Sequence, residues 1–180
     1  MMRVIAGALK GRTLNAPTWE GLRPTSDRLR ETLFNILGPA VQGARVVDGY
    51  AGTGAIGIEA LSRGAAHVTF VERDPRAVRL IEQNLARAGV TERYAIIRAG
   101  FVDAARRLDG AEIVILDPPY APDAVVQALE AAAPLTRGET RVVIEHGKRY
   151  AAPAEHAGLT LQRTVVAGDS ALSFYKRFAQ

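Results

Sequence analysis

The sequence predicts an α/β fold built on a mostly parallel, Rossmann-like sheet. From residue 44 onward, short apolar runs rich in β-branched residues alternate with helical patterns. Asp74 and Pro75 suit the start of a helix, and Gly64 and Gly89 suit helix ends. In order, the chain predicts strand 44–48, helix 54–63, strand 66–72, helix 75–88, strand 94–98, helix 101–107, strand 111–117, helix 122–133 and strand 140–146.

Two further elements are expected before this alternation. Residues 3–14 contain short β-prone runs broken by glycine, which predicts an N-terminal β-hairpin. A cluster of Ser, Thr and Asp residues from Thr25 leads into apolar residues at helical spacing. A capped amphipathic helix should therefore run to Gly38.

The C-terminal segment predicts strands without an intervening helix. Residues 159–166 and 171–178 are β-rich runs separated by a turn at 168–169, which indicates an antiparallel hairpin that closes the sheet. We therefore expect one domain, 1–180, in which the hairpin and helix of 1–40 precede a Rossmann-like core of 41–180.

Composition excludes some chemistry and favours a polyanionic partner. The 180 residues include no cysteine, which excludes disulfides, thiolate metal sites and a cysteine nucleophile. Lys and Arg outnumber Asp and Glu by 23 to 19. Arg3, Lys10 and Arg12 precede the first acidic residue, so this arm is either a phosphate contact or a solvated basic edge strand. The sequence has no signal-peptide pattern and no run of about 18 apolar residues, so we expect a cytoplasmic protein without membrane contact.

A glycine-rich loop after the first strand of the core indicates a nucleotide ligand. The strand ends at Asp48 and runs into Gly49-Tyr50-Ala51-Gly52-Thr53-Gly54, where glycines allow a ligand to approach the backbone closely. Glu72 ends the next strand, 18 residues after Gly54, about the spacing at which such folds bond a ribose diol. Alone, Asp48 could be a turn residue and Glu72 a solvated strand end. Their combination favours a ligand site.

The same loop leaves a second class of enzyme to consider. Residues 52–57 match the G-x-G-x-x-G pattern of NAD-dependent oxidoreductases. However, Gly52 lies four residues beyond Asp48, whereas dinucleotide loops usually place the first glycine directly after the strand. The charge of Asp48 would oppose a pyrophosphate but suits the ammonium and sulfonium groups of S-adenosylmethionine. We therefore expect S-adenosylmethionine as the cofactor.

The motif Asp117-Pro118-Pro119-Tyr120 follows the apolar run 113–116, which places it at the carboxyl edge of the sheet. The prolines hold this loop extended. An exocyclic amine of a nucleobase is a poor nucleophile because its lone pair is delocalised into the ring. The Asp117 carboxylate and the Pro118 carbonyl can accept its N–H groups while Tyr120 stacks on the base.

Two consequences follow for the reaction. The target nucleotide must be unpaired or flipped to reach the motif. Methyl transfer from a sulfonium needs no Lewis acid, so we expect no metal. An isolated match to this motif could be a surface turn, but its position two β–α units after the Asp48 loop favours a catalytic role.

The three histidines, His67, His146 and His156, show no metal-ligand spacing. His146 follows Glu145 at the end of the strand 140–146 and is a candidate for a substrate contact.

Several segments of the chain are shared with one enzyme family. They are Arg3-Val4-Ile5-Ala6-Gly7 with Lys10-Gly11-Arg12, Leu22-Arg23-Pro24-Thr25 with Asp27-Arg28, Arg30-Glu31-Thr32-Leu33-Phe34-Asn35, the loop from Asp48 to Gly54, Glu59-Ala60-Leu61-Ser62-Arg63, Glu72 with Asp74, and Asp117 to Tyr120. Nearly end to end, the chain resembles the bacterial 16S ribosomal RNA (guanine-N2)-methyltransferases, which are class I S-adenosylmethionine-dependent enzymes. The cofactor loop and the Asp117 motif also occur in adenine-N6 and other amino methyltransferases, so the N-terminal segments give the resemblance its specificity.

The resemblance implies a seven-stranded class I methyltransferase sheet and methylation of guanine N2 in 16S ribosomal RNA, at guanine 966. The substrate would be the RNA or an assembling small ribosomal subunit, gripped in part by the basic N-terminal arm. Adenine-N6 or other nucleic-acid amino methylation is the alternative, and NAD-dependent oxidation is a more distant one. The small size of the chain predicts a monomer.

The expected site residues form three groups. The catalytic residues are Asp117, Pro118 and Tyr120. Cofactor contacts are expected from Asp48, Gly49, Tyr50, Gly52, Gly54, Glu72, Arg73, Ala99, Gly100, Phe101 and Asp117. Substrate contacts are expected from Arg3, Lys10, Arg12, Arg23, Thr25, Arg28, Pro119 and Tyr120.

The chain departs from the family pattern in two places. Tyr50 replaces the usual Phe, which keeps an aromatic ring and adds a hydroxyl. Ala99-Gly100 stand where related enzymes often place an Asp or Asn side chain against the adenine amino group. Backbone groups around Ala99, Gly100 and Phe101 would then have to recognise the adenine.

Overall fold

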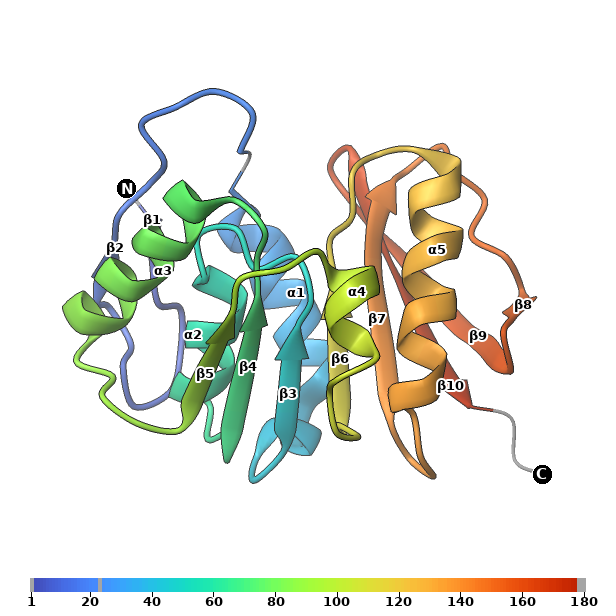
Figure 1. The fold of residues 1–180 in the computed structure, drawn as a ribbon, viewed down its shortest axis with the longest axis horizontal. Helices are drawn as coiled ribbons and strands as arrows, with labels where there is room; N and C mark the ends of the chain where they lie inside the picture. Colours follow the sequence, from blue (N-terminus) through green and yellow to red (C-terminus); the bar gives the residue numbers. More distant parts are fainter. Residues whose placement is uncertain (1, 23, 178–180) are drawn as a thin grey trace.

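The fold, a computed structural model that describes residues 2–22 and 24–177, is built on one twisted sheet between two layers of helices (Figure 1). The sheet order is β5-β4-β3-β6-β7-β10-β9-β8. Its strands are β3 (Arg45–Asp48), β4 (His67–Val71), β5 (Tyr94–Ile97), β6 (Ile113–Leu116), β7 (Arg141–Gly147), β8 (Glu155–His156), β9 (Leu159–Ala167) and β10 (Ser170–Arg177). Neighbours among β3 to β7 are parallel, and β10 lies antiparallel to both β7 and β9.

The helices divide between the two faces of the sheet (Figure 1). They are α1 (Asp27–Leu37), α2 (Ala55–Ser62), α3 (Pro75–Ala88), α4 (Phe101–Ala105) and α5 (Pro122–Ala132), with short 3₁₀ turns at Gly38–Val41 and Ala133–Leu135. Helices α1, α2 and α3 bury their apolar side chains in one core cluster. Helices α4 and α5 bury theirs in a second cluster on the other face. The predicted parallel α/β architecture is confirmed.

The strand order reverses next to β3, and this fixes where a ligand can bind. Strand β3 pairs with β4 on one side and with β6 on the other, although β6 follows much later in the chain. The connections leave these strands in opposite directions, which opens a crevice beyond their carboxyl ends. The loops that follow β3 and β6 are therefore brought together at this edge.

The N-terminal hairpin packs against α2 on the side of the sheet occupied by α1 and α3. Its strands are β1 (Met2–Arg3) and β2 (Thr13–Leu14), which pair antiparallel. The carboxylate of Glu59, fully buried in α2, accepts the backbone N–H groups of Ile5 at 2.8 Å and Ala6 at 3.0 Å. The Ala8 N–H donates to the Ser62 carbonyl at the end of the same helix, at 2.8 Å. These bonds satisfy a buried carboxylate that would otherwise be costly.

Within residues 2–22 and 24–177, the sheet has eight strands where seven were expected. The added strand, β8, contains only Glu155 and His156 and pairs with the outer side of β9. A two-residue strand is too short to show the alternation of apolar and polar residues by which strands are recognised in a sequence. The predicted C-terminal hairpin is confirmed, as are the N-terminal hairpin and the cap of α1, where Ser26 Oγ accepts the Leu29 N–H at 3.2 Å.

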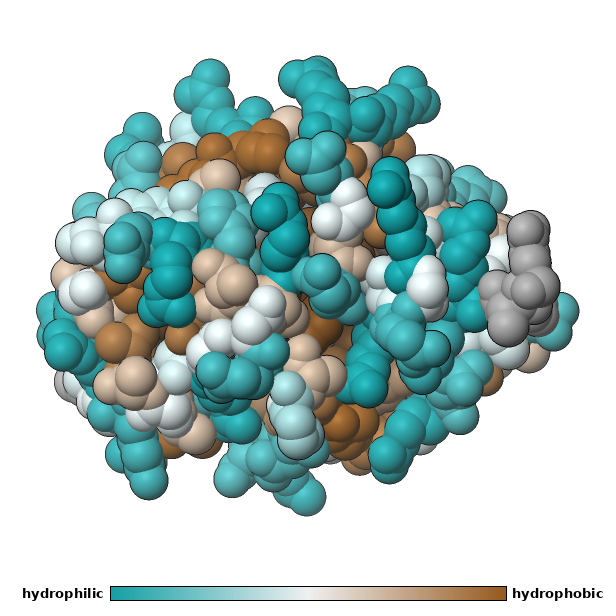
Figure 2. All heavy atoms as spheres, turned by 90° about the horizontal axis from the view of Figure 1, so that it is seen from below, coloured by the Kyte–Doolittle hydropathy of each residue, from teal (hydrophilic) through white to brown (hydrophobic). Residues whose placement is uncertain are grey.

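Figure 2 views the face on which the strands begin, and hydrophilic side chains project from most of it. Within residues 2–22 and 24–177, no helix has both the length and the apolar character needed to cross a membrane.

Gly57 is required by the contact between α2 and the sheet, which gives a stability prediction. A Cβ at this position would lie 2.2 Å from Phe70 Cε1, in a ring that is fully buried. We expect Gly57→Ala to destabilise the fold by about 1–3 kcal/mol, because overpacking outweighs the better helix propensity of alanine. Urea unfolding measures the difference.

Gly110→Ala is the matched control, because its nearest neighbour, Arg137 Nε, would lie 3.4 Å from the new Cβ. Equal stability of the two variants would contradict the packing described for Gly57.

Candidate functional site

Two adjoining cavities lie at the carboxyl edge of the sheet. The larger, of about 640 Å³, lies between the segment before α1, the loop after β3, the Asp117–Tyr120 motif and the β9–β10 turn. The smaller, of about 320 Å³, extends toward α4. Both are lined by Tyr50, Glu72, Arg73 and Pro119. An elongated ligand can therefore span the two cavities across these shared residues.

Glu72 lies where the two cavities meet, and its carboxylate binds backbone N–H groups on either side. Its Oε2 accepts the Gly52 N–H at 2.9 Å and its Oε1 accepts the Asp74 N–H at 2.9 Å. A carboxylate has about four acceptor positions, so each oxygen retains a lone pair beyond these two bonds. Because Glu72 also lines both cavities, it can hold the loop in place and accept hydroxyl groups from a ligand.

The loop after β3 depends on its glycines. Gly52 and Gly54 have φ values of +54° and +78°, in the left-handed region that other residues rarely adopt. At Gly49 the constraint is space, since a Cβ there would lie 2.5 Å from Leu116 Cδ2 and 2.9 Å from Phe101 Cδ2. The backbone can therefore pass close to the base of the smaller cavity.

Asp48 turns inward rather than lining either cavity. Its side chain is buried, with 2% exposure, and its Oδ2 accepts the Gly57 N–H of α2 at 3.0 Å. Burial raises the pKa of Asp48 to about 7, and the nearby Glu72 acts in the same direction. In this structure Asp48 fixes the start of α2, and its expected contact with the cofactor would act through the field of its charge.

The three residues expected at the adenine have different backbone roles. The Ala99 N–H already donates to the Glu72 carbonyl at 3.1 Å, so it is committed to the sheet edge. Gly100 is the N-cap of α4, which leaves the Phe101 N–H in the first turn as a donor that the helix itself does not use. The Phe101 ring packs against Tyr50 with ring centroids 5.6 Å apart. The Phe101 N–H is therefore a better candidate donor than the Ala99 N–H.

The Asp117 motif reaches the larger cavity, as expected. Asp117, Pro118, Pro119 and Tyr120 all line it. Tyr120 is 53% exposed, yet its hydroxyl donates to Glu145 Oε1 at 2.9 Å and lies 2.5 Å from Ser170 Oγ. Burial raises the pKa of Tyr120 to about 12, so the hydroxyl stays protonated and can donate. The exposed ring of Tyr120 is thus held in place by the hydrogen bonds of its hydroxyl group.

Glu145 and Ser170 were not predicted as site residues. Both line the larger cavity and both contact Tyr120. Glu145 lies in the predicted strand 140–146, one residue before its end, so its place at the carboxyl edge could have been inferred. Ser170 reaches the site only because β10 runs antiparallel beside β7, and no signal in the sequence indicates that contact.

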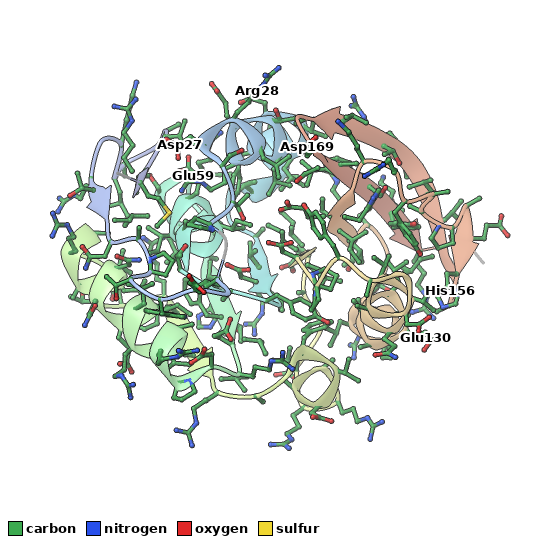
Figure 3. All side chains as sticks on the ribbon, turned by 90° about the horizontal axis from the view of Figure 1, so that it is seen from above. Asp27, Arg28, Glu59, Glu130, His156 and Asp169 are labelled. Carbon is green, nitrogen blue, oxygen red and sulfur yellow. The ribbon has the colours of Figure 1, made fainter. Side chains whose placement is uncertain are left out.

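The residues expected to contact the substrate lie in two separate parts of the structure. Thr25 lines the larger cavity, together with neighbouring residues before α1. Arg28 is exposed in the first turn of α1 and points away from the centre of the molecule (Figure 3). Arg23 lies outside the described residues.

The basic arm lies at the opposite edge of the sheet. The arm's turn contacts the C-terminal end of α2 through the bond from Ala8 to Ser62, and a Cβ at Gly89, after the last residue of α3, would lie 3.0 Å from Arg12 Nη1. Those helix ends face the amino ends of the strands. Arg3, Lys10 and Arg12 are exposed but do not line the cavities.

His146 has an internal role instead of the substrate contact considered for it. It is 1% exposed, with Nε2 at 2.7 Å from Ser173 Oγ and Nδ1 at 2.9 Å from the Gly147 carbonyl. Successive residues of a strand point to opposite faces, so the exposure of Glu145 to the cavity turns His146 away from it. Figure 3 shows His156 beside Glu130, at the outer edge of the molecule. Across the described ranges, no three His, Asp or Glu side chains are grouped so that they could hold a metal ion.

The buried carboxyl of Asp48 predicts a pH dependence of stability. Because its pKa of about 7 in the folded state exceeds the ordinary value of 3.8, the folded protein binds more protons between those values. Its contribution to the free energy of unfolding is therefore present below about pH 4 and is lost as the pH rises to 7. Asp48→Asn removes this titration and keeps an acceptor for Gly57.

Urea unfolding of both proteins at pH 5 and pH 8 tests this. The wild type should lose stability relative to Asp48→Asn at the higher pH. A difference between the two proteins that does not change with pH would contradict the raised pKa.

The chain is similar over nearly its whole length to known proteins. The chain is 36% identical to "Ribosomal RNA small subunit methyltransferase D" of Escherichia coli (strain K12), over 99% of this chain and 91% of that protein. It is 35% identical to "Putative rRNA methyltransferase YlbH" of Bacillus subtilis (strain 168), over 98% and 99% of the two chains. The solved structure titled "Putative methyltransferase yhhF from Escherichia coli" superposes with a TM-score of 0.87 at 34% identity, covering 99% of each chain. A family model described as "Conserved hypothetical protein 95" matches residues 2–176, and the chain belongs to that family.

Proposed function

We propose that the protein transfers a methyl group from S-adenosylmethionine to the exocyclic N2 of a guanine in 16S ribosomal RNA, at guanine 966. One observation carries the reaction type. The Asp117–Tyr120 motif and the loop held by Glu72 line the same cavity, so an amino group and a nucleoside cofactor can meet there. The names of the relatives support ribosomal RNA of the small subunit as the substrate.

The chain's residues fit the cofactor. Glu72 offers its remaining lone pairs to the ribose hydroxyls, and the smaller cavity accommodates the adenine beside Phe101. The glycines of the loop let the backbone approach the methionine part, while the ionised form of Asp48, which predominates above its raised pKa of about 7, would favour its cationic groups. When bound, S-adenosylmethionine supplies an electrophilic methyl group on its sulfonium.

The residues of the motif prepare the acceptor. The Asp117 carboxylate and the Pro118 carbonyl accept N–H groups of the amine, which favours a pyramidal nitrogen whose lone pair faces the methyl carbon. Tyr120 stacks on the base, and its bonds to Glu145 and Ser170 hold the ring in one orientation. The amine nitrogen would take up this methyl group, S-adenosylhomocysteine would leave with the electrons of the broken carbon–sulfur bond, and the proton that the amine releases would pass by way of the Asp117 carboxylate to solvent.

The proposed substrate determines where the enzyme acts and which alternative functions an experiment must distinguish. An enzyme of ribosomal RNA acts in the cytoplasm, on the RNA or on an assembling small subunit, and we infer that it acts as a monomer. Incubation with labelled S-adenosylmethionine and small subunits lacking the modification, followed by mapping of the product, tests the proposal. Label on guanine N2 is expected. Label on adenine N6, or on DNA alone, would contradict guanine-N2 methylation and favour the alternative, another nucleic-acid amino methyltransferase.

Asp117→Ala separates turnover from cofactor binding. Because Asp117 is assigned to the amine, we expect the variant to lose methyl transfer while its affinity for S-adenosylmethionine stays within a few fold. Activity with unmodified subunits and calorimetric titration of the cofactor measure the two properties. Complete loss of cofactor binding would show that Asp117 belongs to the cofactor site instead.

Thermal shift distinguishes the methyltransferase from an NAD-dependent oxidoreductase. S-adenosylhomocysteine should raise the melting temperature, since a ligand that binds only the folded state stabilises it. NAD should leave it unchanged. Stabilisation by NAD alone would reverse the assignment of the nucleotide loop.

A further inference from the structure

A third cavity lies outside the proposed active site, along α3. It has a volume of about 460 Å³ and is formed between α3 and the segment that precedes α1. We call it the α3 groove, and its lining residues are Asn15, Ala16, Thr18, Trp19, Arg76, Arg79, Leu80 and Gln83. Within the described chain, none of these residues is acidic, and an aromatic ring lies among the arginines.

The arginines along α3 form a row on one side of the helix. Arg76, Arg79 and Arg87 recur at intervals of three and eight residues, which at about 100° per residue places them within a sector of about 80° on one side of the helix. Arg87 lies beside the hairpin, where its Nε donates to Thr13 Oγ1 at 2.9 Å, and Arg12 reaches the end of the helix at Gly89. The row therefore joins the α3 groove to the basic N-terminal arm.

Most of this charge is available to a polyanion. Asp74 neutralises Arg76, with Oδ2 at 2.7 Å from Nη2, and this bond lowers the pKa of Asp74 to about 2. Arg79 is exposed in the groove, and Arg87 and Arg12 are exposed beyond it. A nucleic-acid backbone presents phosphates that match such a row.

Trp19 supplies a surface for a base. Its ring is half-buried and lines the groove, and the Arg76 guanidinium lies 5.2 Å from the ring centroid, which fixes the orientation of the ring. Aromatic rings next to arginines are the usual platform for unpaired bases, because stacking does not depend on base identity. The ring and the arginine row thus suit two parts of the same ligand.

The α3 groove continues from the active site. Gly21 and Leu22 follow Trp19 closely and line the larger cavity, and the segment between β2 and α1 passes over the end of the sheet (Figure 1). Arg73 lines both site cavities and precedes Arg76 by three residues. A strand whose target nucleotide enters the cavity can therefore extend into the groove.

We propose that the α3 groove binds single-stranded RNA adjoining the target nucleotide, with a base stacked on Trp19 and phosphates bound by Arg79, Arg87 and Arg12. This proposal rests on the proposed function for the identity of the ligand as RNA. It assigns the basic arm a place at the end of an extended path rather than at the cavity. A structured protein partner would not need a stacking platform, and an RNA duplex has no unpaired base to stack.

Trp19 is the single tryptophan of the chain, so its fluorescence reports directly on the groove. We expect a short single-stranded oligoribonucleotide to quench this emission to saturation, and the same sequence annealed into a duplex to quench it far less. Arg79→Glu should raise the Kd of the single strand at least about fivefold. For Arg79→Ala, the slope of log Kd against log salt should fall by about 0.7, the value for one lost phosphate contact on a single strand.

Arg163→Glu is the matched control, since Arg163 is exposed on β9, far along the sheet from α3. Its Kd should stay near the wild-type value. Absence of quenching by the single strand, or equal weakening by Arg79→Glu and Arg163→Glu, would overturn the proposal.

Methylation of unmodified small subunits provides a second readout. Trp19→Ala and Arg79→Glu should raise KM with kcat within about twofold, while thermal stabilisation by S-adenosylhomocysteine is retained. Normal methylation with unchanged KM in both variants would reject the α3 groove and leave the proposed function intact. Quenching without any methyl transfer by the wild type would reject the proposed function and leave the groove as an RNA site.

Discussion

The site depends first on the carboxylate of Glu72. This group joins three segments that the chain supplies separately, because it directly follows β4, accepts the Gly52 N–H of the loop after β3, and accepts the Asp74 N–H at the start of α3. A buried or half-buried carboxylate that bonds two backbone amides is strongly favoured over the same group without partners. The loop is therefore fixed before any ligand arrives, and the lone pairs that remain face the cavities. A cofactor that binds to a preformed loop loses little affinity to ordering it.

A second buried side chain connects the loop after β3 to the N-terminal segment by hydrogen bonds. Asn84, fully buried in α3, accepts the Asn15 N–H at 2.7 Å and donates to the carbonyls of Asn15 at 3.1 Å and Thr53 at 2.9 Å. One amide side chain thus ties the cofactor loop to the segment that carries Trp19. The position of the α3 groove is consequently set by the same framework that holds the loop proposed to bind the cofactor. This linkage explains how a segment outside the sheet can form part of a defined path to the site.

The sequence predicts the parts of this structure that depend on local patterns. Helix α3 has the predicted bounds, because Pro75 and Gly89 mark its ends, and Glu72 lies at the predicted strand end. Long-range packing was not predictable in the same way. No local sequence pattern indicates that Glu59 accepts hydrogen bonds from the N-terminal hairpin, or that β8 adds an eighth strand to the described sheet. Asp48 illustrates the limit at the site, since β3 ends at this residue as predicted, but its hydrogen bond to Gly57 turns its side chain away from the cavities.

The C-terminal hairpin explains how the target loop is held although prolines already restrict it. Prolines fix the backbone of the motif, but the ring of Tyr120 is 53% exposed and would otherwise rotate about its side-chain bonds. Its hydroxyl is bound by Glu145 at the end of β7 and by Ser170 at the start of β10, two residues that meet only because these strands pair antiparallel. The strands that close the sheet therefore complete the side of the cavity that is proposed to hold the acceptor. The parallel strands carry both the loop after β3 and the Asp117–Tyr120 motif, which follows β6, so the proposed acceptor side combines parallel and antiparallel parts of one sheet.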